Sequence, residues 1–140
     1  MKELDNLVKI NKLNTEAVDA NEFAGMLRAG DTKIKDASLK GLSEDSQFAL
    51  AYSAAHAFSL AALRWHGYRS DSRYLVFQCL QHTLGLGKAK WRVLDKCHNA
   101  RNLAEYEGHL DINSQLLKEL FSITEELQVL VKALAPIEEH

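Results

Sequence analysis

The fold is decided by the stretch SEDSQFALAYSAAHAFSLAALRW, residues 43 to 65. Ser43 is suited to cap a helix, and Glu44 and Asp45 suit the positive end of its dipole. Steps of four, three, four and three separate apolar residues on one helical face: Ala51, Ala55, Phe58, Ala62 and Trp65. The dense alanines allow a second helix to approach closely, and Gly67 is a natural stop. The stretch therefore predicts a long, close-packed helix.

Outward toward the N-terminus, the pattern predicts two less regular helices. Leu4, Leu7, Val8 and Leu13 indicate a short first helix. Phe23, Met26 and Leu27 mark a second helix, whose last turns we expect to be blurred by Gly25 and Gly30.

Outward toward the C-terminus, three more helices are expected. The first runs from about Leu75 to Leu84 and ends at Gly85 and Gly87. The second runs from Lys88 to about Glu107 and is closed by Gly108. The third is capped by Asp111 and carries an apolar stripe from Ile112 to Leu134. No strand pattern competes, and the single proline, Pro136, follows the last helix.

Short connections between long helices favour antiparallel neighbours. We therefore expect an all-α, up-and-down bundle of about five to six helices with a four-helix antiparallel core. The 140 residues suit a single domain, 1–140, in which the first two helices (about 1–40) extend a core at about 43–135.

Composition narrows the class of protein. The chain lacks a run of about 18 apolar residues that could span a membrane, and its first residues are acidic where a signal peptide needs basic ones. We expect a soluble cytoplasmic protein with no membrane partner. Cys79 and Cys97 fit buried thiols in a reducing compartment. Together with His82 and His98 they do not converge on a metal, so neither a metal site nor a cofactor is expected.

Charge is uneven along the chain. Residues 43–105 hold eight Lys and Arg against five acids, whereas residues 106–140 hold two Lys against seven acids. The middle of the chain is therefore the part suited to face a phosphate, and the C-terminal helix is not.

The helix from Lys88 places an unusual polar pair, Arg101 and Asn102, near its end. At about 100° per residue, we expect the core contact to be formed by Val93, Cys97, Ala100 and Ala104. The opposite side is expected to carry Trp91, Leu94, His98, Arg101, Asn102, Glu105 and His109. This mixed face is typical of a partner surface or a lined cleft, and it makes self-association plausible. The alternative is a surface pair of Arg101 and Glu105, with Trp91 packed on a neighbouring helix of the same chain.

The segments Ala51–Phe58 and Ala61–Arg69, followed by Arg101–Tyr106, resemble the HEPN superfamily, whose members are small helical bundles and often dimers. The resemblance covers roughly residues 43–134. The catalytic pattern of the family is an Arg, a polar residue, and a His after about four to six intervening positions. Arg101 and Asn102 match its first part. Tyr106, Glu107 and Gly108 occupy the positions where the His is expected.

Active HEPN proteins are metal-independent endoribonucleases that join Arg and His residues of two subunits across a dimer cleft. The resemblance implies a homodimer and a cleft for RNA or a nucleotide, with Arg101, Asn102 and Tyr106 in the catalytic positions. Tyrosine is a poor base near neutrality, so a site with Tyr106 in place of His is expected to be slow or inactive. His98 or His109 could substitute. Other members have lost catalysis and act in toxin–antitoxin pairs beside a nucleotidyltransferase-like partner, so a noncatalytic interaction module is the alternative function.

Overall fold

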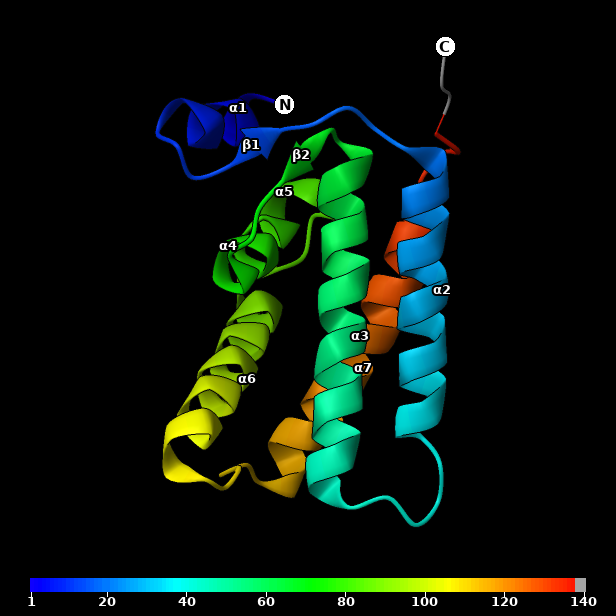
Figure 1. Cartoon of the computed structure of the whole chain (residues 1–140), viewed down its shortest axis with the longest axis vertical. Coiled ribbons are helices and arrows are strands. Elements are labelled where there is room, and N and C mark those ends of the chain that lie inside the picture. Colours follow the sequence, from blue (N-terminus) through cyan, green and yellow to red (C-terminus); the bar gives the residue numbers. More distant parts are fainter. Residues whose placement is uncertain (138–140) are drawn as a thin grey trace.

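The computed structural model describes residues 1–137 and confirms an all-α helical bundle (Figure 1). The last three residues of the expected domain lie outside the described residues. Its elements, in chain order, are α1 Lys2–Lys9, β1 Asn14–Thr15, α2 Ala20–Ala37, α3 Glu44–Trp65, β2 Tyr68–Arg69, α4 Arg73–Gln78, α5 Leu80–Thr83, α6 Lys88–Glu107 and α7 Ser114–Lys132.

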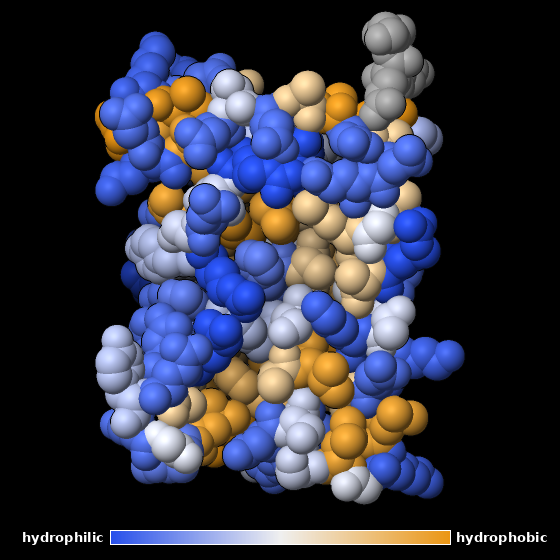
Figure 2. Space-filling view, viewed as in Figure 1, coloured by the Kyte–Doolittle hydropathy of each residue, from blue (hydrophilic) through white to orange (hydrophobic). Residues whose placement is uncertain are grey.

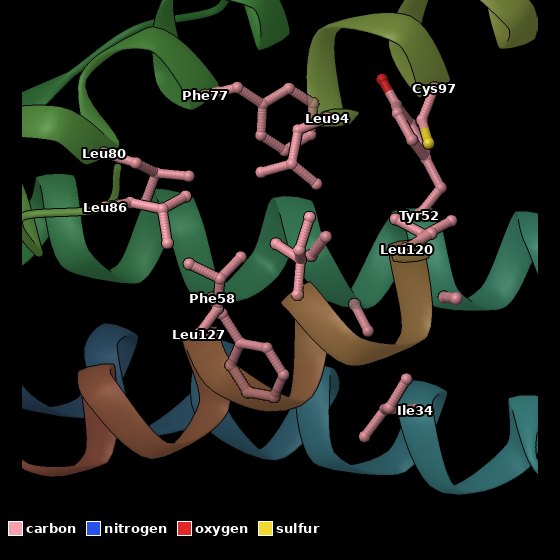
Figure 3. Close-up of a cluster of buried hydrophobic side chains, with 14 of the residues drawn as sticks. Ile34, Tyr52, Phe58, Phe77, Leu80, Leu86, Leu94, Cys97, Leu120 and Leu127 are labelled. Atoms are coloured by element: carbon pink, nitrogen blue, oxygen red, sulfur yellow. The ribbon is translucent and has the colours of Figure 1, made fainter. Parts of the chain in front are cut away.

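Helix α3 is the centre of the bundle. It packs on α2 and α7 along its length, and consecutive long helices run antiparallel (Figure 1). Its alanines are fully buried where the neighbouring helices cross: Ala51, Ala54, Ala55, Ala61 and Ala62. On the other side, large side chains such as Tyr52 and Phe77 fill the wider space toward α6 (Figure 3). Small residues of α3 and of its neighbours therefore allow close approach on one side, and aromatic rings from α3 and α4 fill the space on the other.

The expected ends of α3 are confirmed. The Ser43 Oγ accepts a hydrogen bond of 3.1 Å from the backbone N–H of Ser46 and so caps the helix. At the other end Gly67 has a φ of +87°, which a residue with a side chain rarely adopts. The chain therefore leaves the helix where the sequence predicts.

Helix α2 is regular, contrary to the expectation that glycines would blur its last turns. It continues through Gly25 and Gly30 to Ala37. Gly30 is buried against Phe58 of α3, and a Cβ at this position would lie 2.4 Å from the Phe58 Cε1. The missing side chain lets the two helices approach, and this tertiary packing outweighs the low helix propensity of glycine.

The segment expected as one helix from Leu75 to Leu84 is two short helices, α4 and α5, which meet at Cys79. The cap of α7 also differs from the expectation. Asn113, rather than Asp111, accepts the N–H of Leu116, at 2.7 Å. The limits of α6 agree with the prediction, and Gly108 ends it with a φ of +77°.

A short antiparallel pairing of β1 and β2, absent from the sequence prediction, holds the N-terminal segment. Arg64, which is only 2% exposed, also holds this segment by hydrogen bonds to three acceptors. Its Nε donates to Glu22 at 2.6 Å, and its terminal nitrogens donate to the backbone oxygens of Glu16 at 3.0 Å and Ala17 at 2.5 Å. Arg69 completes the network with bonds of 2.6 Å to both glutamates. The start of the chain is thereby fixed across the upper end of α3.

Candidate functional site

The mixed face of α6 does not lie opposite the core. Leu94, expected on that opposite side, is 0% exposed and belongs to the main core together with Cys97 (Figure 3). Val93 and Ala100, expected at the centre of the core contact, pack only at its edge. The sequence-based prediction therefore had the wrong rotation of α6 about its own axis. The face that carries Leu94, His98 and Arg101 is turned toward α3 and α4 of the same chain.

Trp91 confirms that the mixed face packs within the chain. Its ring lies 6.2 Å from that of Tyr74 on α4, edge to face. Farther along α6, a terminal nitrogen of Arg101 lies 3.8 Å from Glu105, at the limit of an ion pair. The Glu105 side chain is exposed, so this pair contributes little stability and leaves most of the Arg101 charge uncompensated.

A hydrogen-bonded triad joins α3 to α6. The Tyr52 hydroxyl lies 2.9 Å from Nδ1 of His98, and the Asn102 amide nitrogen lies 3.2 Å from Nε2 of the same ring. An amide nitrogen can only donate, so Nε2 accepts and Nδ1 carries the proton of the neutral imidazole. In this arrangement Nδ1–H donates to the Tyr52 oxygen. His98 is thus held in one orientation by bonds to both ring nitrogens.

Burial lowers the pKa of His98, and the charges of Arg101 and Arg73 lower it further, whereas Asp95 acts in the opposite direction. Burial also raises the pKa of Tyr52. Both shifts favour the uncharged forms of these side chains. The triad is therefore neutral at neutral pH.

Two guanidinium groups from different helices converge on Tyr52. Arg73 of α4 has its Cζ 5.5 Å from the centre of the Tyr52 ring, and Arg101 of α6 has its Cζ at 5.4 Å. Within residues 1–137, Arg73 forms no ion pair, and the one ion pair of Arg101 is the long contact with Glu105. Two cations thus lie over one ring, beside neutral hydrogen-bonding groups, and only Arg101 has an acid, Glu105, within ion-pair distance.

A pocket of about 510 Å³ opens beside these residues, between the first half of α3 and the end of α6. Its lining includes Tyr52 and Arg101, the small side chains of Ala49 and Ser53, and the acids Asp45 and Glu105. We name Tyr52, Arg73, His98, Arg101 and Asn102, with this pocket, the α3–α6 cleft. It offers charged and neutral donors to an anion of modest size.

Another groove, of about 540 Å³, lies on the α7 side of α6. Its charged residues are Lys96 against Glu107, Asp111 and Glu119. It has no guanidinium group, and its three acids outnumber its single lysine, so it suits a phosphate less well than the pair of Arg73 and Arg101 does.

The other predicted site residues lie at the edge of the α3–α6 cleft or outside it. His109 and Glu105 line the pocket, but α6 ends at Gly108, so His109 does not continue the helical face. Tyr106 is 89% exposed. The structure therefore brings together His98, Arg101 and Asn102, whereas Tyr106 does not join their hydrogen bonds.

Comparison with known proteins finds no matching family model, curated protein or solved structure. Within residues 1–137 no helix is long and apolar enough to cross a membrane. The chemistry of the cleft is thus the main guide to function.

Sequence reasoning missed Tyr52 and Arg73 as site residues. Tyr52 follows the buried face of α3 and so looks like an ordinary core aromatic, and Arg73 follows a loop. Their role depends on the crossing of α4 over α6, which no local spacing encodes. The one available signal is the concentration of Lys and Arg between residues 43 and 105.

Proposed function

We propose that the chain is a HEPN-like, RNA-binding protein that holds the phosphate backbone of RNA in the α3–α6 cleft. The observation that carries this proposal is the pair of guanidinium groups of Arg73 and Arg101 over the Tyr52 ring. Guanidinium groups bind phosphate oxygens through two parallel hydrogen bonds, and phosphate contacts dominate the affinity of proteins for nucleic acids. Nucleotides carry the same phosphate and are weaker ligands of this cleft.

The proposed protein has low or no ribonuclease activity. Cleavage of RNA without a metal needs a proton acceptor and a proton donor at the reacting phosphate. Both ring nitrogens of His98 are engaged by Tyr52 and Asn102, and the tyrosine at position 106 is exposed. Binding, rather than turnover, is therefore the activity expected of the purified protein.

Fluorescence anisotropy of a labelled strand of ten uridines tests the proposal. We expect Arg73→Ala and Arg101→Ala each to weaken binding by about tenfold, as for loss of a charge-assisted contact. Each should also reduce the slope of log affinity against log salt by about 0.7. Arg92→Ala is the matched control, because Arg92 is an exposed arginine of the same helix and does not line the pocket. Absent binding at low salt, or equal effects of the three substitutions, refutes RNA binding in this cleft.

The same RNA, incubated with a metal chelator, tests for cleavage. We expect no cleavage, or slow cleavage that Arg101→Ala abolishes while folding is retained. Rapid cleavage by the wild type would contradict the low activity proposed above, but it would remain consistent with RNA binding in the α3–α6 cleft.

A noncatalytic interaction module is the second candidate, and the outer face of α6 favours it. Leu103 is 54% exposed there, close in sequence to the exposed Tyr106. Sedimentation velocity of the wild type and of Leu103→Asp tests whether this face joins two copies. We expect the wild type to be a dimer and the variant to shift toward monomer. A wild type that stays monomeric at all concentrations rules out the homodimer.

A further inference from the structure

The pocket of the α3–α6 cleft has a cationic end and an acidic end. Helices α3 and α6 run antiparallel, so the last turns of α6 lie at the same end of the bundle as the first turns of α3 (Figure 1). Tyr52 and Arg101 line the pocket where Arg73 also faces the Tyr52 ring. Toward the start of α3, the pocket is lined by Asp45 of the first helical turn. Its charge therefore changes sign along the helix axes.

The two acids of the pocket lie at increasing distances from the cationic end. Glu105 follows Arg101 by four residues and is therefore about 6 Å farther along α6. Asp45 precedes Tyr52 by seven residues and is about 10 Å farther along α3. Both carboxylates repel an anion, which is thereby kept at the guanidinium groups. A carboxylate accepts hydrogen bonds and donates none, so the acidic end suits an uncharged group that is rich in donors.

Small side chains leave room for a planar group between the two helices. Ala49 of α3 and Ala104 of α6 both line the pocket, together with Ser53 and the apolar Phe48 and Leu110. On the face shown in Figure 2, apolar residues lie between hydrophilic ones near the end of the bundle where α3 begins and α6 ends. The volume of about 510 Å³ falls within the range of pockets that bind small molecules, roughly 300 to 1,000 Å³.

We propose that this pocket binds one guanosine of the RNA strand, with its phosphate at Arg101, its ribose at Glu105 and its base at Asp45. The proposal rests on the proposed function, because Arg73 and Arg101 hold the phosphate of that nucleotide. Phosphate, ribose and base follow one another along a nucleotide in the same order as these side chains follow one another along the pocket.

Guanine is the base whose hydrogen-bonding edge fits a carboxylate best. Its N1–H and its N2 amino group are adjacent donors, so the two oxygens of one carboxylate can accept from both. Adenine and cytosine place an unprotonated ring nitrogen beside their amino group, and uracil places a carbonyl oxygen on either side of its N3–H. A carboxylate repels these acceptors. Within residues 1–137 the Asp45 carboxylate forms no ion pair, so a cation does not compete with the base for it.

Glu105 gives the pocket a means of distinguishing RNA from DNA. A ribose 2′-hydroxyl can donate to its carboxylate, and deoxyribose lacks that group. The contact of Glu105 with Arg101 is long, at 3.8 Å, and the Glu105 side chain is exposed. Turning the carboxylate toward a ribose therefore costs little.

Fluorescence anisotropy tests the base contact by comparing the labelled strand of ten uridines with the same strand carrying one central guanosine. We expect the wild type to bind the guanosine strand about tenfold more tightly, as for one bidentate contact to a base. A central inosine, which lacks the N2 amino group, should lose most of this preference. Asp45→Asn should abolish it. Glu44→Gln is the matched control and should retain it, because Glu44 lies in the same first turn of α3 but lines a different pocket, toward α7.

A central 2′-deoxyguanosine tests the ribose contact. We expect the wild type to bind this strand about fivefold more weakly than the guanosine strand, as for the loss of one hydrogen bond. Glu105→Ala should bind the two strands equally. A difference that Glu105→Ala retains in full overturns the role of this carboxylate.

Equal affinity of the wild type for the uridine and guanosine strands overturns the guanosine pocket and leaves RNA binding at Arg73 and Arg101 intact. A preference for guanosine that Asp45→Asn and Glu44→Gln both retain also overturns it, because the base is then read elsewhere. Failure of the wild type to bind any of the strands overturns both proposals.

Discussion

The Tyr52 hydroxyl and Nδ1 of His98 lie 2.9 Å apart, so one hydrogen bond joins α3 to α6. The two rings are also nearly parallel, with an interplanar angle of 16°. Tyr52 is otherwise a core residue, 1% exposed, and its ring lies beneath Arg73 and Arg101. One side chain therefore serves both the core and the cleft.

Tyr52→Phe removes the hydroxyl and keeps the ring. Because His98 then loses a partner in a partly buried position, we expect the free energy of unfolding to fall by about 1 kcal/mol. Urea unfolding measures this change. Tyr106→Phe is the control and should leave stability unaltered, since Tyr106 is exposed. An equal effect of the two substitutions would show that the bond to His98 adds no stability.

Gly30→Ala should destabilise the protein even though alanine is the better helix former. The new Cβ would overlap Phe58, and overpacking of this kind costs about 1 to 3 kcal/mol. Gly25→Ala, in the same helix but with its nearest neighbour at 3.7 Å, should stabilise by about 0.5 to 1 kcal/mol. Thermal unfolding compares the two variants. Combining Gly30→Ala with Phe58→Leu should recover part of the loss, and no recovery would contradict the proposed overlap.

Arg64→Met should strongly weaken the N-terminal attachment. The substitution leaves two backbone oxygens without their donor and Glu22 with only Arg69, and each buried polar group left unsatisfied costs about 1 to 3 kcal/mol. Arg69 is more exposed, so Arg69→Met should cost about 1 kcal/mol or less. Urea unfolding ranks them, and equal losses would argue against a special role for the buried arginine.

The free energy of unfolding should decrease as the pH is lowered, because of the depressed pKa of His56. Its folded pKa of about 4 lies below the ordinary value of 6.5, so the folded state binds a proton less readily than the unfolded chain does. The contribution is complete above pH 6.5 and is lost as the pH falls toward 4. We expect a loss of about 2 to 3 kcal/mol over this range. His56→Gln should flatten the profile, and an unchanged slope would contradict the lowered pKa.

Much of the fold follows from sequence because its signals are local. Ser43 and Gly67 mark the ends of α3 through the chemistry of caps, and Gly108 marks the end of α6 in the same way. Asp111 and Asn113 are both favoured N-cap residues, so residue type alone did not decide between them, and no glycine or proline marks the break at Cys79.

The candidate site was predicted only in part. Arg101, Asn102 and His98 were found because they share one helix, and their mutual spacing follows from its geometry. The rotation of α6 about its axis was wrong, since Leu94 and the polar residues had been grouped against the smaller Ala100 and Ala104. In the structure, the larger Leu94 fills the wide space beside α3, and His98 is carried inward with it. Arg73 reaches the cleft only through the crossing of α4.

The hydrogen bonds of Arg64 to the N-terminal segment also constrain the order in which the chain folds during synthesis. The backbone oxygens of Glu16 and Ala17 are bound by a side chain that lies 48 and 47 residues later. At a translation rate of about 5 to 20 residues per second, the N-terminal segment waits several seconds for this partner. Helix α2 emerges first, so the segment that contains Glu16 and Ala17 can bind Arg64 only after the α2–α3 hairpin has left the ribosome.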